Sequence, residues 1–381
     1  MIRQEQSHRN STVIIQAGQS MNILESNLER IRVLRETKTL GEEDLRILLE
    51  TITQEEEEEL YTQARQVCEE HYGKAVFLRG LIEFSSFCKN DCYYCGLRRS
   101  NTNAERYRLS EEEILSCARQ GYELGFRTIV LQSGEDLFYT DDRICGIVSG
   151  IKRLNPDLAV TLSIGEKSRE SYQRYYDAGA DRYLLRHETS NPAHYRYLHP
   201  SGLSIENRKR CLADLKEIGF QVGCGIMVGS PGQTMDHVLE DLYFMARFQP
   251  HMVGIGPFIP HQDTPFSKEK RGTVRDTLHL LSVIRLMLPK VLLPATTALG
   301  TIDPAGREKG ILAGANVVMP NLSPSDVRGK YLLYDGKICT GDEAAECRIC
   351  MQRRIERIGC RIDNGRGDWC GFRQKDRSGR T

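Results

Sequence analysis

The chain has 381 residues, of which 40% are hydrophobic, and its 52 Lys and Arg balance its 52 Asp and Glu, so the formal net charge is zero. This is enough chain for one large core, and the balanced charge argues against nucleic-acid binding, which needs clustered positive charge. No apolar run approaches the roughly 20 residues that span a bilayer, and residues 1–20 lack a secretory signal, so we expect a cytoplasmic protein with no membrane partner.

The predicted elements begin with a polar, aperiodic stretch, residues 1–20, that is typical of a tail. From about Met21 to Tyr72 apolar residues recur at helix spacing, which predicts a helical extension. The acidic run from Glu55 to Glu59 within it indicates a solvated helix start, since carboxylates suit the first helical turn.

After Gly73 short apolar runs alternate with amphipathic helical stretches. Eight such strands predict an α/β fold, a (β/α)8 barrel of the TIM type; an open doubly wound sheet would alternate similarly with fewer strands. We therefore expect a tail and helical extension at 1–72, the barrel at 73–325, and a C-terminal extension at 326–381. The predicted strands are Phe77–Ser86, Thr128–Ser133, Ala159–Ile164, Arg182–Thr189, Gln221–Val228, Met252–Ile259, Val291–Thr297 and Asn316–Pro320.

Chemistry in such barrels lies at the carboxyl ends of the strands, and three cysteines follow the first strand directly. Cys88, Cys92 and Cys95 have the short spacings with which loops hold iron–sulfur clusters. The next cysteine, Cys117, lies on an apolar helix face, and no Cys or His follows Cys95 within 20 residues. A zinc knuckle or a ferredoxin-type cluster would need a fourth ligand nearby, so the spacing favours a four-iron cluster with one reactive iron.

This C-x3-C-x2-C loop, with Tyr94 before its last cysteine, resembles the signature of the radical S-adenosylmethionine (SAM) superfamily. The resemblance implies a [4Fe-4S] cluster whose fourth iron is chelated by the amino and carboxylate groups of SAM. It also implies reductive cleavage of SAM to methionine and a 5′-deoxyadenosyl radical, with an electron donor such as a ferredoxin or flavodoxin.

Further residues at strand ends suit SAM binding. At the end of the second strand, Gly134 permits close backbone approach and Glu135 offers a charge-assisted acceptor, where the family has a GGE-like segment for the methionine ammonium. In the fourth strand, Arg186 and Glu188 share one face by alternation, which indicates either a structural ion pair or a ligand site. The resemblance assigns Glu188 and Arg208 to SAM and Arg186 to the substrate. The other cofactor-binding candidates are Gln132, Ser133, Ser163 and Met227.

Several segments, among them RHET and PATTALGT, resemble the HydE family of [FeFe]-hydrogenase maturases from about Gly73 to Cys350. This resemblance implies assembly of the diiron subcluster, from a small iron carbonyl/cyanide complex bound to cysteine. It implies as partners a second radical SAM maturase, which makes that complex, and a GTPase scaffold maturase. A lumen with hydroxyl donors and one cation suits such a small anion. The candidates for contact with it are Arg186, Thr161, Thr296, Thr297 and Tyr331.

A second cysteine set, Cys339, Cys347 and Cys350, follows the last strand. It is similar to an optional auxiliary site, usually [2Fe-2S], in some HydE-like chains; surface thiols or a zinc site are the alternatives. Cys360 and Cys370 receive no role.

Three other functions compete with this interpretation. A methylornithine synthase-like mutase should place lumen carboxylates against a substrate ammonium. Biotin synthase needs further cysteines on central strands, where this chain has Cys224 alone. A non-catalytic iron–sulfur carrier would have no use for Glu135, Glu188 and Arg208 around its cluster.

Overall fold

The computed structural model describes residues 23–341 and 344–372, with only the backbone for 344–347. The predicted tail, residues 1–20, lies outside these ranges. No helix in the described part of the chain combines the length and the apolar character that crossing a bilayer requires.

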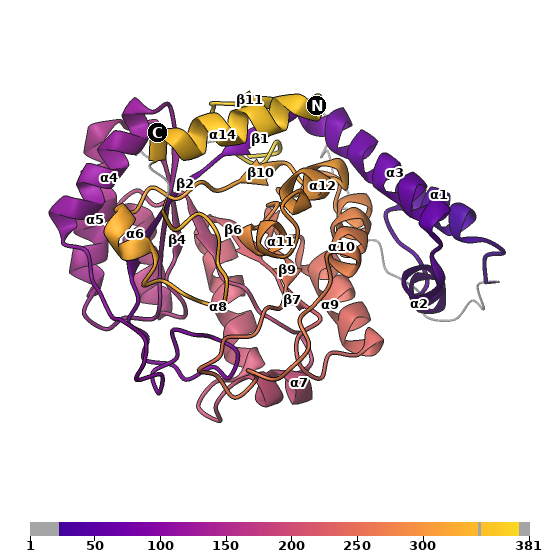
Figure 1. Cartoon of the computed structure of the whole chain (residues 1–381), viewed down its shortest axis with the longest axis horizontal. Helices are drawn as coiled ribbons and strands as arrows, with labels where there is room; N and C mark the ends of the chain where they lie inside the picture. Colours follow the sequence, from indigo (N-terminus) through magenta and orange to yellow (C-terminus); the bar gives the residue numbers. More distant parts are fainter. Residues whose placement is uncertain (1–22, 342–343, 373–381) are drawn as a thin grey trace, which may run out of the picture.

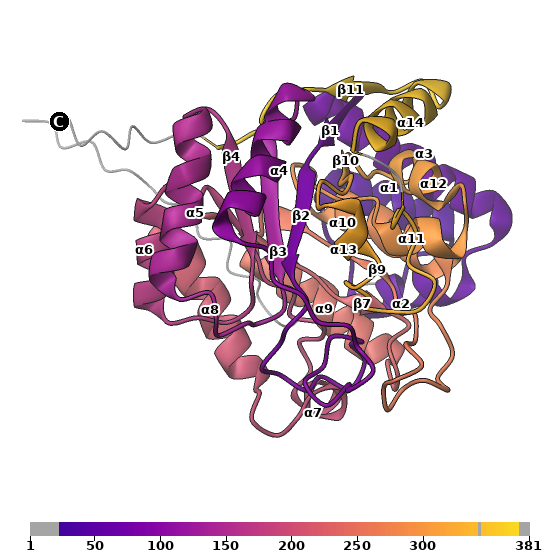
Figure 2. The same ribbon diagram turned by 60° about the vertical axis from the view of Figure 1, so that its left-hand side comes forward.

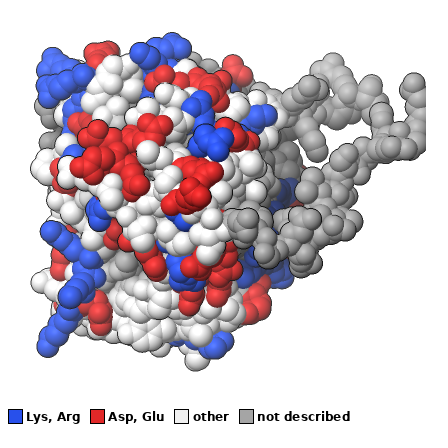
Figure 3. Space-filling model, turned by 90° about the vertical axis from the view of Figure 1, so that its right-hand side faces the viewer, with Lys and Arg blue, Asp and Glu red and all other residues white. Residues whose placement is uncertain are grey.

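The N-terminal extension is helical, as predicted, and forms α1 (Asn27–Thr37), α2 (Glu42–Thr51) and α3 (Gln54–Tyr72). The Thr53 side chain caps α3 and Glu56 caps it reciprocally, which confirms that the acidic run starts a helix. These helices flank the barrel on the right of Figure 1. The face they form carries both acidic and basic groups (Figure 3).

The barrel wall consists of short parallel strands. They are β1 (Ala75–Leu78), β2 (Gly80–Ser85), β3 (Thr128–Ser133), β4 (Ala159–Ser163), β5 (Arg182–Leu184), β6 (Gln221–Cys224), β7 (Met227–Val228), β8 (Met252–Val253), β9 (Gly256–Pro257) and β10 (Val317–Val318). Six of them form one sheet in the order β2-β3-β4-β5-β6-β8, β1 pairs with β10, and β7 pairs with β9. Isolated bridges Met252–Leu292, Pro294–Val317 and Leu81–Asn321 connect β8 through β10 back to β2. The closed α/β barrel is therefore confirmed.

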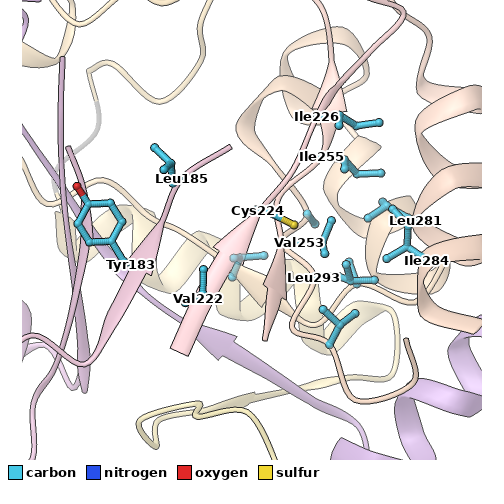
Figure 4. Close-up of a cluster of buried hydrophobic side chains, with 14 of the residues drawn as sticks. Tyr183, Leu185, Val222, Cys224, Ile226, Val253, Ile255, Leu281, Ile284 and Leu293 are labelled. Carbon is cyan, nitrogen blue, oxygen red and sulfur yellow. The ribbon is translucent and has the colours of Figure 1, made fainter. Parts of the chain in front are cut away.

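Helices cover the outside of this wall (Figures 1 and 2). The helices that follow the N-terminal extension are α4 (Glu111–Glu123), α5 (Asp141–Leu154), α6 (Arg169–Asp177), α7 (Pro192–Leu198), α8 (Ile205–Ile218), α9 (Met235–Phe248), α10 (Val274–Met287), α11 (Thr297–Ile302), α12 (Gly306–Leu312), α13 (Ser325–Arg328) and α14 (Ala344–Arg357). Of these, α7 lies at the carboxyl end of the barrel and α14 lies across its amino end (Figure 1). Cys224 and Val253 point from the wall toward Leu281 and Ile284 of α10 (Figure 4), and all four side chains are fully buried or nearly so. Cys117 is likewise buried, as predicted.

Several predicted strands are wrong in extent. Val291–Thr297 makes only the isolated bridges at Leu292 and Pro294, because proline has no N–H for a ladder. The predicted strand from Arg182 ends at Leu184, and the predicted strands from Phe77, Gln221 and Met252 are each broken in two.

The C-terminal extension closes the amino-terminal end of the barrel, at the top of Figure 1. Its strand β11 (Arg361–Asp363) pairs with β1. Beyond it, Asp368 lies 2.5 Å from the buried Arg182 guanidinium and accepts from Gln221 Nε2 at 2.7 Å. The ion pair of Asp368 with the buried Arg182 thus attaches this end segment to the barrel. The domain boundaries at residues 72 and 325 remain predictions.

Asp368→Asn is expected to lower the free energy of unfolding by about 3 kcal/mol, since it leaves the Arg182 cation, 2% exposed, without its counter-charge. Urea denaturation measures this effect. Asp303→Asn, which breaks a more exposed pair with Lys309, is the control and should cost under about 1 kcal/mol. Equal losses of unfolding free energy in the two variants would contradict a stabilising role of the buried Arg182–Asp368 pair.

Candidate functional site

The three cysteines of the predicted cluster loop lie at the carboxyl end of the barrel, between β2 and α4, at the lower edge of Figure 2. Cys88, Cys92 and Cys95 are free thiols in partly buried positions. Burial raises the pKa of all three, that of Cys95 to about 12, and the Cys95 and Cys88 thiols raise that of Cys92 further. Their mutual influence places the three sulfurs in one neighbourhood, and metal binding would have to displace their protons.

Among the described residues, no three Cys, His, Asp or Glu side chains are grouped so that they could hold a single metal ion. A cubane does not need such a group, because each thiolate binds a different iron.

The loop around the cysteines is held in shape by its own polar contacts. Asp91 accepts from Arg98 Nε at 2.9 Å, from Arg98 Nη2 at 2.7 Å and from the Ser100 N–H at 3.0 Å. The Arg98 hydrogen bonds hold the pKa of the Asp91 carboxyl well below its usual range. A fixed loop keeps the three thiols positioned for one ligand.

The end of β3 packs directly on the cluster loop. The Glu135 N–H points at Cys88 Sγ, 3.4 Å away, and the Lys89 N–H donates to the Glu135 carbonyl at 2.9 Å. A Cβ on Gly134 would lie 2.2 Å from the Phe87 carbonyl oxygen and 2.8 Å from the Cys88 Cβ. Glycine is therefore required here for the close approach of two backbones.

Gly134→Ala is expected to displace the Phe87–Cys88 backbone and to reduce the iron bound after anaerobic reconstitution at least threefold, since backbone atoms cannot yield as a flexible side chain can. Iron analysis of the purified variant checks this. Gly202→Ala is the matched control, because a Cβ there meets nothing within 4 Å. Normal iron content in Gly134→Ala would show that the two segments move apart freely.

A chain of polar contacts leads from the cluster loop into the barrel. Glu135 Oε1 accepts from the Glu166 N–H at 3.0 Å, Glu166 Oε1 lies 2.6 Å from Arg208 Nε, and Arg208 Nη1 donates to the Arg186 carbonyl at 3.3 Å. Burial alone would lower the pKa of Arg208, but Tyr195, Glu166 and Glu135 together hold it above its usual value. Arg208 thus stays a cation beside the cysteines.

Arg186 and Glu188 form an ion pair at 3.0 Å, so their side chains meet as predicted, although the strand ends before them. A turn of the backbone brings the two side chains together: Glu188 has φ 63°, and its N–H donates to the Gly225 carbonyl at 3.0 Å. A glutamate in the left-handed region is strained, and such strain persists where surrounding structure imposes it, often at functional sites. His187, between them, turns outward and is buried 3.3 Å from Asp241.

The barrel lumen carries hydroxyls with free hydrogen-bonding capacity. Thr161 and Thr296 are such groups: their Oγ1 atoms are buried and have no hydrogen-bond partner among the described residues. Gln132 of β3 lies in register with Ser163 of β4, and its Nε2 is 3.4 Å from the buried Tyr331 hydroxyl. Buried hydroxyls without partners are costly, so these positions suit a polar guest.

The remaining cofactor candidates line the rim. Tyr94 is partly buried near Cys92 and Glu188, and its hydroxyl lies 3.2 Å from His199 Nε2. Met227 packs with Phe258, and the Ser133 hydroxyl donates to the Gly134 carbonyl at 2.7 Å.

The auxiliary cysteines are only partly described. Cys339 and Cys350 line a cavity of about 230 Å³ with Thr297, and Arg307 Nη2 donates to Cys339 Sγ at 3.1 Å. The side chain of Cys347 lies outside the described residues. Thr297 is thereby placed at this cavity, beside the candidate auxiliary site.

Sequence reasoning missed Glu166 and the buried pair of Glu83 and Lys337, whose Nζ is 2.6 Å from Glu83 Oε1. Glu83 could have been recognised from the sequence, because it is the one charged residue inside the apolar strand GLIEFS. Lys337 could not have been recognised as its partner, since the two residues are 254 positions apart in the chain.

Comparison with known proteins agrees with this geometry. Residues 82–245 match the model of the radical SAM superfamily. The [FeFe] hydrogenase maturase subunit HydE of Thermotoga maritima is 50% identical over 302 residues, 79% of this chain and 86% of that protein. The 3-methylornithine synthase of Methanosarcina acetivorans is 34% identical over 75% of this chain and 81% of that protein. A crystal structure of methylornithine synthase superposes with a TM-score of 0.78 at 30% identity, covering 87% of this chain and 97% of that one.

The thiol loop and the buried Arg208 beside it fit a [4Fe-4S] cluster and SAM, the cofactors that members of this superfamily use. The roles of individual residues stay predictions. The chain is a radical SAM enzyme, and within that superfamily it belongs to the family of the [FeFe]-hydrogenase maturase HydE.

Proposed function

We propose that this chain cleaves SAM reductively, in the cytoplasm, to assemble the diiron subcluster of the [FeFe]-hydrogenase active site. The observation that carries the proposal is the contact chain from Cys88 through Glu135, Glu166 and Arg208 to Arg186. It connects the loop that would hold the cluster with the backbone of the residue whose side chain would hold the substrate.

When bound, the [4Fe-4S] cluster and SAM supply a 5′-deoxyadenosyl radical from reductive cleavage of the sulfonium. Cys88, Cys92 and Cys95 would hold three irons. Arg208 would bind the SAM carboxylate through the N–H groups that Glu166 leaves available, and Glu135 would accept from the methionine ammonium. Tyr94, Glu188 and the backbone around Gly134 would fix the position of SAM, and the packed rim at Met227 would exclude water.

The substrate that best suits the lumen is a small anion, and we propose the iron carbonyl/cyanide complex bound to cysteine. Arg186 would bind it by charge, and the Thr161 and Thr296 hydroxyls would donate to its polar atoms. A second radical SAM maturase would deliver it and a GTPase scaffold maturase would accept the product. Cys339, Cys347 and Cys350 would hold an optional [2Fe-2S] cluster outside this path.

The identity to methylornithine synthases makes a mutase the second candidate. A substrate ammonium would need an available lumen carboxylate. The buried Glu83 is occupied by Lys337 Nζ at 2.6 Å and Asn321 Nδ2 at 2.9 Å, and Glu188 is paired with Arg186. Glu83 is therefore not available to a substrate ammonium, whereas Arg186 keeps a buried Nε–H that has no hydrogen-bond partner among the described residues and can donate to an anion.

Co-expression tests the proposal. A hydrogenase produced with the second radical SAM maturase and the GTPase should gain hydrogen-evolving activity only when this chain is present. Equal activity without it would overturn the maturase role. Conversion of lysine to 3-methylornithine by the purified, reconstituted chain would establish the mutase instead.

A further inference from the structure

An exposed apolar surface lies directly beside the cluster loop. Leu137 and Phe138 follow Glu135 and Asp136 in the connection from β3 to α5, and they are 71% and 44% exposed. Large apolar side chains this exposed lie outside the core, and two adjacent ones form a small apolar surface that is open to a partner.

Two arginines frame this apolar surface. The Arg108 guanidinium lies 3.8 Å from the centre of the Phe87 ring and 4.8 Å from that of Phe138, and Arg143 lies 3.8 Å from the centre of the Phe138 ring. We name the surface of Phe87, Arg108, Leu137, Phe138 and Arg143 the arginine–aromatic patch. Its aromatic rings are held in place by the cations stacked on them.

The patch carries positive charge. Asp136 neutralises Arg108 at 2.7 Å, whereas Arg143 has no ion-pair partner within residues 23–341 and 348–372. Of the neighbouring acids, Asp142 pairs with Arg174, Asp141 accepts from Ser171 Oγ at 2.7 Å and Glu113 accepts from the Ser110 N–H at 2.6 Å. The Glu111 carboxylate lies against Gly146 of α5, one helical turn beyond Arg143. A negatively charged partner would therefore meet a cation at the edge of an apolar centre.

The patch is joined to a cluster ligand by short covalent and hydrogen-bonded paths. Phe87 immediately precedes Cys88, and the Glu135 N–H, two residues before Leu137, points at Cys88 Sγ at 3.4 Å. A redox partner seated on the patch would stand next to the group that it must reduce.

We propose that the arginine–aromatic patch is the docking surface for an acidic one-electron carrier protein. This rests on the proposed function, because it takes Cys88 as a ligand of the [4Fe-4S] cluster. The carrier gives up one electron and the cluster gains one, with no bond made or broken in the docking step. A small apolar centre with a charged edge suits the weak, short-lived encounters of redox partners.

Reduced flavodoxin is the probe, and two variants test the surface: Arg143→Glu, and Leu137→Ser combined with Phe138→Ser. Each should weaken the affinity of the reconstituted chain for flavodoxin at least fivefold by calorimetry at low salt, and should slow SAM cleavage driven by flavodoxin. Cleavage driven by dithionite, which needs no docking surface, should stay within twofold of wild type. Arg353→Glu and Leu312→Ser, at exposed positions on α14 and α12, are the matched controls and should behave as wild type.

Wild-type affinity and flavodoxin-driven rate in both patch variants would overturn the docking proposal. Equal loss with flavodoxin and with dithionite would also overturn it, because the patch would then act on the cluster itself. Failure of the wild-type chain to cleave SAM with either reductant would instead overturn the proposed function, so the two failures are distinguishable.

Discussion

Cys92→Ala is expected to abolish SAM cleavage, with a fall of at least a hundredfold in 5′-deoxyadenosine formed per chain. Three thiolates hold the cluster in the proposed site. Burial and then the neighbouring Cys95 and Cys88 raise the pKa of Cys92, which places its sulfur close to both. Removing it leaves two ligands for four irons, which is too few to retain a cubane. The iron content after reconstitution should fall together with the activity.

Cys350→Ala is the matched control for that experiment. Cys350 is an exposed thiol of the candidate auxiliary set, and its loss should leave SAM cleavage within about twofold of wild type; we expect the same of Cys347→Ala. Equal loss of cleavage in Cys92→Ala and Cys350→Ala would contradict the proposal that SAM cleavage depends on the cysteine set of Cys92 and not on the auxiliary set.

Arg186→Ala is expected to abolish hydrogenase maturation in co-expression while SAM cleavage without substrate stays within about threefold of wild type. The guanidinium is the proposed anion-binding cation, and truncating one partner of a buried, hydrogen-bonded charge pair costs about 2–5 kcal/mol, which is roughly thirtyfold or more in binding. Arg208, which we assign to SAM, is untouched by this change except at the Arg186 carbonyl, which alanine retains.

The ion pair complicates Arg186→Ala, because Glu188 loses its partner at 3.0 Å. Arg186→Lys keeps the charge near Glu188 but removes the planar fork, so it should fold normally and still impair maturation at least tenfold. Full maturation activity in both variants would contradict the anionic-substrate proposal.

The sequence predicted those parts of the site that depend on local spacing. Cys88, Cys92 and Cys95 share one loop, and Gly134 and Glu135 follow a strand whose observed bounds, Thr128–Ser133, are those predicted. The left-handed turn at Glu188 was not predictable, because alternation along a strand assumes regular backbone. Its side chain nevertheless meets Arg186, since the Gly225 carbonyl holds the turn.

Contacts between distant parts of the chain were beyond the sequence. The partners of Glu83 and Arg182 are Lys337 and Asp368, which lie 254 and 186 residues away and come from the C-terminal extension. No local periodicity encodes such pairs. The predicted strand Val291–Thr297 is wrong for a different reason. Its apolar residues predict continuous pairing with the neighbouring strands, but Pro294 has no N–H to donate to such a ladder.

The most direct test of the account is Mössbauer spectroscopy of the chain reconstituted anaerobically with 57Fe, before and after addition of SAM. We predict that one iron of the four changes its isomer shift when SAM is added, as expected if the polypeptide ligates only the other three. Four irons with unchanged parameters in the presence of SAM would contradict the central claim.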